Sequence, residues 1–79
     1  MKQIISEALK AERQKTGLSQ DKLAGKAELS VRYYQAIESG AKQPSMAALF
    51  RLCISMGISY SDILQPAWEQ FVKKSKTSN

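Results

Sequence analysis

Apolar side chains recur at three- and four-residue spacing along most of the chain, a pattern typical of helices that bury one face. No segment alternates apolar and polar residues with the period of two that a half-buried strand shows. The pattern therefore predicts an all-α fold, a compact bundle of five to six short helices. We expect these helices over residues 3–16, 20–27, 31–39, 46–56, 60–64 and 66–74. The inward residues would be Ile5, Leu9, Leu23, Ala24, Ala27, Tyr34, Ile37, Met46, Leu49, Cys53 and Met56.

Small residues mark the boundaries of these segments. Glycines at positions 17, 40 and 57 follow three of them, where the end of a helix favours a residue with positive φ. Serines at positions 19, 30, 45 and 59 precede new segments, where a hydroxyl can accept a hydrogen bond from a free backbone N–H. Pro66 suits the first turn of a helix, so we expect a new helix to start there.

The length of 79 residues is enough for one domain. We expect this domain over residues 1–74, followed by a disordered basic tail over residues 75–79. No run of 18 apolar residues and no secretory hydrophobic region is present, so we expect a cytoplasmic protein without a membrane partner.

Histidine is absent and Cys53 is the only cysteine, so an internal disulfide is excluded and neither a metal site nor a cofactor is expected. So small a chain has little room to enclose a catalytic pocket, and we expect a binding module rather than an enzyme. The net charge is +5, and residues 10–51 hold eight bases and four acids. This basic excess fits either a nucleic-acid partner or a solvated surface.

Residues 19–40 have the composition of two short helices joined by a tight turn. Ala24 is small where the two helices would cross closely. Leu29, Tyr34 and Ile37 are apolar where the second helix must face the core. A helix-turn-helix needs this arrangement, because its second helix turns the opposite face outward, into a DNA major groove.

Residues 9–64 resemble the Cro and phage-repressor (XRE-type) helix-turn-helix family, and therefore imply a repressor-like fold. Each matching position is weak alone, but their order and spacing are specific. The matches are Arg13, Thr16-Gly17-Leu18-Ser19-Gln20, Leu23-Ala24, Leu29-Ser30, Ile37-Glu38-Ser39-Gly40, Pro44-Ser45-Met46, Leu49, Leu52, Met56-Gly57-Ile58-Ser59 and Asp62-Ile63-Leu64.

The resemblance assigns roles to single residues of the second and third segments. It implies that Gln20 contacts a phosphate and braces the recognition helix, and that Arg13 and Glu38 form a structural pair between helices. Positions that face base edges in the family are occupied here by Val31, Arg32, Gln35 and Ala36, and positions that meet the DNA backbone by Ser39 and Lys42.

Helical geometry agrees, because residues 31, 32, 35, 36 and 39 share one face. Arg32 can donate two bonds to guanine, and Gln35 can pair with adenine. Arg32 can instead clamp a phosphate. Tyr34 is expected in the core and Tyr33 outside, where its hydroxyl either reaches a phosphate or meets only solvent.

Two positions depart from the family pattern. Glu28 stands in the turn where relatives often carry glycine, and a positive φ there would cost about 1–2 kcal/mol. Val31 begins the recognition helix where many relatives carry a polar base reader, so the operator sequence cannot be transferred from them.

A single unit of this kind reads few base pairs, and two copies usually bind half-sites about 34–36 Å apart. Apolar residues that a monomer core does not need are therefore candidates for a dimer interface. They are Phe50, Ile54, Ile58 and Tyr60, together with Trp68 and Phe71 of the last helix. The alternative for this helix is that it packs back on its own core.

The sequence thus predicts a sequence-specific transcriptional regulator that binds double-stranded DNA as a homodimer on a palindromic operator. It would control its own synthesis, as a compact phage repressor or a restriction–modification controller does. The alternative is a protein-interaction module on the same fold, such as an antitoxin or a coactivator.

Overall fold

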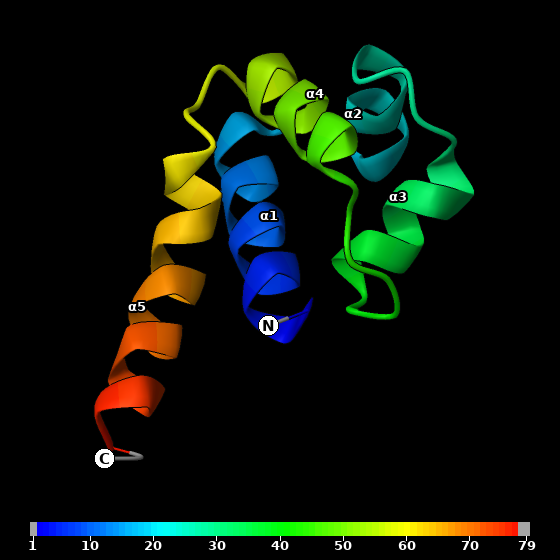
Figure 1. The fold of residues 1–79 in the computed structure, drawn as a ribbon. Helices are drawn as coiled ribbons and strands as arrows, with labels where there is room; N and C mark the ends of the chain where they lie inside the picture. Colours follow the sequence, from blue (N-terminus) through cyan, green and yellow to red (C-terminus); the bar gives the residue numbers. More distant parts are fainter. Residues whose placement is uncertain (1, 78–79) are drawn as a thin grey trace.

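A computed structural model describes residues 2–77, and these form five helices with no strand among them. The helices are α1 (Lys2–Thr16), α2 (Gln20–Lys26), α3 (Val31–Glu38), α4 (Met46–Met56) and α5 (Ser61–Thr77). The expected all-α class and the first four helices are confirmed, with ends that differ by at most one residue. The molecule measures 44 × 23 × 20 Å along its principal axes. The longest helix, α5, runs beside α1 (Figure 1).

Side chains from all five helices meet in one core. Leu9 of α1, Leu23 of α2, Tyr34 of α3, Leu52 of α4 and Ile63 of α5 are all fully buried. Figure 1 shows α1 in the middle, with α5 along one side and α2 and α3 on the other. This arrangement buries one face of α3 against the domain and leaves its other face outside.

Serine hydroxyls cap three helices as the sequence predicts. Ser19, Ser30 and Ser45 each accept a hydrogen bond from the backbone N–H three residues later, at 3.1–3.2 Å. The glycines at positions 17, 40 and 57 all have positive φ, between 70° and 85°. Each therefore ends its helix in a conformation that costs other residues energy.

The C-terminal third corrects two expectations. Residues 60–64 and 66–74 do not form separate helices, because α5 continues through Pro66, its sixth residue. Proline removes one backbone hydrogen bond there. Burial of Ile63 and Ala67, on either side of it, holds the helix against the core. The helix also passes the expected boundary at residue 74 and reaches Thr77. The rest of the predicted tail, residues 78–79, lies outside the described residues.

Met46 is a third correction. We expected it in the core, but its side chain is 58% exposed at the first turn of α4. The other three apolar residues predicted on the inner face of that helix, Leu49, Cys53 and Met56, are buried. The helical spacing is right for Met46, but burial on α4 begins only with Ala48 and Leu49, so the first residue of the helix stays exposed.

Candidate nucleic-acid interface

The turn between α2 and α3 sets where the third helix begins. Two backbone bonds close it, from Leu29 N to Ala24 O at 2.8 Å and from Glu28 N to Gly25 O at 3.2 Å. This pair of bonds is the Schellman arrangement, which needs a left-handed residue after the helix. Glu28 occupies that position with φ 58°. The turn thus has the geometry in which relatives often carry glycine, and Glu28 adopts the strained conformation.

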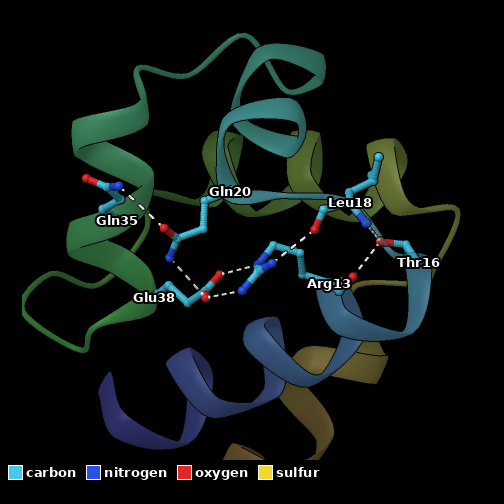
Figure 2. A network of polar contacts seen from close by, with 6 residues as sticks. All are labelled: Arg13, Thr16, Leu18, Gln20, Gln35 and Glu38. Atoms are coloured by element: carbon cyan, nitrogen blue, oxygen red, sulfur yellow. Dashed lines mark hydrogen bonds and ion pairs between the residues drawn. The ribbon is translucent and has the colours of Figure 1, made fainter.

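A network of polar side chains ties α3 to the preceding helices (Figure 2). Glu38, at the end of α3, accepts two bonds from Arg13 of α1, from Nε at 2.8 Å and from Nη2 at 2.7 Å. Arg13 also donates to the carbonyl of Leu18 at 3.0 Å. Bidentate geometry of this kind gives both strength and a defined orientation. The pair therefore joins α1 to α3 through a single rigid contact.

The network continues to the outer face of α3 through Gln20. Gln20 Nε2 donates to Glu38 Oε1 at 3.1 Å, and Gln35 Nε2 donates to Gln20 Oε1 at 3.4 Å. Figure 2 shows Gln20 between the buried carboxylate and the amide of Gln35. No sequence pattern indicates the link between Gln20 and Gln35, because it joins residues 15 positions apart on different helices.

Glu38 is ionised in this setting. Its side chain is only 4% exposed. Burial works to raise the pKa of Glu38, but its neighbours, above all the hydrogen-bonded Arg13, hold that pKa below its ordinary value. The same partnership raises the pKa of Arg13. At neutral pH the network thus contains an ion pair rather than a neutral hydrogen bond.

The outward face of α3 carries both long polar side chains that the sequence predicts there. Arg32 and Gln35 are exposed, and so is Ser39 just after the helix. Val31 and Ala36 are only half-buried, and Val31 also packs against the core. On the face formed by residues 31, 32, 35, 36 and 39, the side chains of Arg32 and Gln35 are therefore exposed to solvent, while that of Val31 is partly buried against the core.

Tyr33 departs from the exposed position that we expected. It is half-buried and packs against the core, and its hydroxyl accepts a hydrogen bond from Ser45 N at 3.2 Å. Lys42 Nζ lies 5.9 Å from the centre of its ring, at the distance of a cation–π contact. Tyr33 thus holds the segment between α3 and α4 in place, and Lys42 lies beside it. A shallow hollow at this point is lined by Ser30, Arg32, Tyr33, Ala36 and Lys42.

Tyr34 is fully buried, as its place in the sequence predicts. Its hydroxyl makes no hydrogen bond with any described residue. Burial, and then the neighbouring Glu38 carboxylate, raise the pKa of Tyr34 far above its ordinary value, so the phenol stays neutral. It contributes to the core and offers no group to a ligand.

Apart from Met46, the large exposed apolar side chains form two areas, one at the end of α4 and one on α5. The first surrounds the end of α4, where Ile54 is 77% exposed and Phe50 meets Tyr60 edge to face at 5.8 Å. Ile58 lies there too, but it is half-buried and packs against the core. The second is on α5, where Trp68 is 62% and Phe71 57% exposed. So α5 does pack on the core, through Ile63 and Ala67, and still presents two aromatic side chains outward.

The part of the chain that the structure describes contains neither a metal site nor a membrane-spanning helix. No group of three or more acidic or cysteine side chains is placed to hold a metal ion between residues 2 and 77. None of the described helices has the length and apolar character needed to cross a membrane.

Residues 9–63 match the family model described as helix-turn-helix. Because this match covers more than half of the chain, the chain belongs to the XRE-type helix-turn-helix family. It carries a DNA-binding domain of the kind found in transcriptional regulators.

Three curated relatives are bacterial proteins named for regulation or control. The HTH-type transcriptional regulator DdrOP3 of Deinococcus deserti is 36% identical over 77% of this chain. Control protein C.MunI of a Mycoplasma species is 33% identical over 68% of the chain and 73% of its own length. The uncharacterized regulator y4dJ of Sinorhizobium fredii is 23% identical over 87% of the chain and 90% of its own length. The chain spans only 47% of the length of DdrOP3.

Two crystal structures of the clp gene regulator ClgR from Corynebacterium glutamicum share the fold. One superposes with a TM-score of 0.80 at 25% identity, covering 98% of this chain and 82% of the other. The second has a TM-score of 0.78 at 28% identity, covering 87% and 90%. The five-helix arrangement of α1 to α5 is therefore that of a known helix-turn-helix regulator.

Proposed function

We propose that this chain binds operator DNA sequence-specifically, with α3 in the major groove, and that it acts as a homodimer on a palindromic site. The observation that carries the proposal is the division of α3 into two faces. Tyr34, Ile37 and Glu38 are buried behind it, while Arg32 and Gln35 are exposed in front. A recognition helix needs both a fixed back and polar side chains free to reach base edges.

Arg32 and Gln35 are the proposed base readers, with guanine and adenine as their respective partners. Val31 and Ala36 supply short apolar contacts to a thymine methyl group. For the phosphates we propose Gln20, Tyr33, Ser39 and Lys42. The Tyr33 hydroxyl accepts from Ser45 N, so its own proton is still available to donate to a phosphate oxygen.

The homodimer is proposed to form through the exposed apolar side chains of α4 and α5. Trp68 and Phe71 are large, rigid and more than half exposed, which is the composition that interface cores favour. Phe50, Ile54, Ile58 and Tyr60 form the neighbouring candidate surface. A two-fold pair of α3 helices would then read two half-sites, about 34–36 Å apart.

We also propose that the regulator controls its own synthesis. The relatives named as transcriptional regulators and as a control protein support a role in controlling genes. A domain of this kind can respond to its own concentration, because dimerisation and operator binding both follow mass action.

Selection of random duplexes by the purified protein tests the proposal. We expect a two-fold symmetric consensus. Arg32→Ala should lower affinity for the selected site about 5- to 150-fold, and affinity for random duplex much less. Arg51→Ala, which removes the same charge from an exposed position on α4, is the matched control.

Equal losses of specific and random binding in Arg32→Ala would show that Arg32 contacts a phosphate and does not read a base. An absence of any selected consensus would contradict the DNA-binding function and favour a protein-interaction module. Salt dependence gives a second check, because a chain that neutralises about six phosphates loses roughly 10³-fold in affinity between 50 and 200 mM salt.

A further inference from the structure

In the network of Arg13, Glu38, Gln20 and Gln35, the donor and the acceptor of each hydrogen bond are fixed by the groups present. A carboxylate only accepts hydrogen bonds, and Arg13 already donates to both oxygens of Glu38. Gln20 can therefore join Glu38 only through its amide nitrogen, as it does at 3.1 Å. Once that nitrogen faces the carboxylate, the amide oxygen of Gln20 faces away from it.

The orientation of the Gln20 amide in turn constrains the amide of Gln35. Gln20 Oε1 only accepts, so Gln35 has to turn its nitrogen toward it, as the 3.4 Å contact shows. Gln35 is exposed. An isolated glutamine amide rotates by 180° and exchanges its oxygen and nitrogen at little cost. Here the ionised Glu38, two side chains away, makes one of these orientations better than the other.

The favoured orientation of the Gln35 amide leaves one hydrogen-bond acceptor and one donor free on the outer face of α3. One N–H of Gln35 is used by Gln20, which leaves its Oε1 and its second N–H side by side. This acceptor and donor match the N6–H donor and N7 acceptor of adenine in the major groove. Guanine presents two acceptors there, which an outward carbonyl oxygen would meet unfavourably.

We propose that Glu38, acting through Gln20, is a positioning residue that makes Gln35 select adenine over guanine. This inference rests on the proposed function, because it concerns the same recognition helix. Arg13 and Glu38 are held by burial and by two direct bonds, so the order of donors and acceptors is set before DNA arrives. Such preorganisation raises discrimination without requiring any contact between Glu38 and the DNA.

The experiment compares selected duplexes for Gln20 variants. Gln35→Ala first identifies the base position that Gln35 reads, as the one where an adenine preference of about 5- to 150-fold is lost. Gln20→Lys places an ammonium group, which only donates, between Glu38 and Gln35. Gln35 must then turn its oxygen inward and its NH₂ outward, and we expect the preferred base to change from adenine to guanine. Gln20→Leu removes the link, and adenine and guanine should approach parity.

Base ratios are the readout because loss of a phosphate contact by Gln20 lowers affinity for all duplexes alike. The control is Gln20→Lys combined with Gln35→Ala, which should show the base spectrum of Gln35→Ala alone. Thermal melting of each variant reports whether it is folded.

An unchanged adenine preference in both Gln20 variants would overturn the inference. So would a selected consensus in which Gln35→Ala alters no adenine position, although operator binding would then stand. A protein that selects no duplex at all would overturn the proposed function itself, which separates the two failures.

Discussion

At the scale of single residues, Glu28 and Gly25 are each placed where the other residue type would be more stable. Glu28 has a left-handed backbone, which suits glycine, and Gly25 has a helical backbone, which suits a residue with a Cβ. Gly25 lies inside α2, and a Cβ built on it meets nothing within 4 Å. Glu28 has φ 58°, where a glycine is free of the Cβ clash. The sequence identified Glu28 as the exception in the turn, but only the backbone geometry shows that the strained conformation is adopted.

We predict that Glu28→Gly raises the free energy of unfolding by about 1 kcal/mol and that Gly25→Ala raises it by about 0.5–1 kcal/mol. Urea denaturation measures both. The matched control is Gly17→Ala, which also adds a Cβ in open space but at φ +76°, and should cost about 1 kcal/mol. Equal effects of Gly25→Ala and Gly17→Ala would show that backbone conformation is not the cause.

At the scale of helices, one ion pair holds α3 against α1. The pKa of Glu38 lies below its ordinary value of 4.5, because the folded state favours the ionised carboxylate. The unfolded chain therefore binds this proton at a higher pH than the folded chain does. The stability that Glu38 contributes is present above the ordinary pKa and is lost as the pH falls through the lowered one.

We predict that Glu38→Gln lowers the free energy of unfolding at neutral pH by about 3 kcal/mol, because it leaves Arg13 partly buried without its counter-ion. The variant should also lose less stability than the wild type as the pH falls below 4.5. Chemical denaturation at several pH values measures this. Glu12→Gln, which removes the more exposed pair with Lys15, is the control and should cost under about 0.5 kcal/mol. Parallel pH profiles for wild type and Glu38→Gln would contradict the role of this carboxylate.

At the scale of the whole molecule, exposed apolar side chains gather at the end of α4 and on α5. Figure 1 shows α5 on the opposite side of α1 from α3. Exposed aromatic and aliphatic side chains of this size favour association, because burying them removes apolar surface from water. The homodimer stays a prediction, and its interface is open to direct test.

We predict that Ile54→Lys or Trp68→Ala shifts the protein from dimer toward monomer in sedimentation velocity, because each removes apolar surface from the proposed interface. Met46→Lys is the matched control for Ile54→Lys, since Met46 is an apolar residue of α4 that is also exposed, at 58%. A wild type that sediments as a monomer would contradict the dimer. An unchanged distribution in both interface variants would place the interface on another surface.

The sequence by itself determined the helical class, the helix-turn-helix, the serine caps and most of the core. These features depend on local spacing and on backbone preferences within a few residues, which a single chain displays directly. The helical spacing of Leu23 and Ala24 on one helix, and of Tyr34 and Ile37 on the next, was enough to predict which face of each short helix is buried.

Only the tertiary structure decided the features that depend on contacts between distant residues. It joined the two expected C-terminal helices into α5, because packing of Ile63 and Ala67 outweighs the hydrogen bond lost at Pro66. It placed Tyr33 against Ser45 rather than in solvent, and it linked Gln20 to Gln35. Such contacts are set by how the helices pack, and hydrophobic spacing along one helix carries no information about the neighbour that a polar side chain will meet.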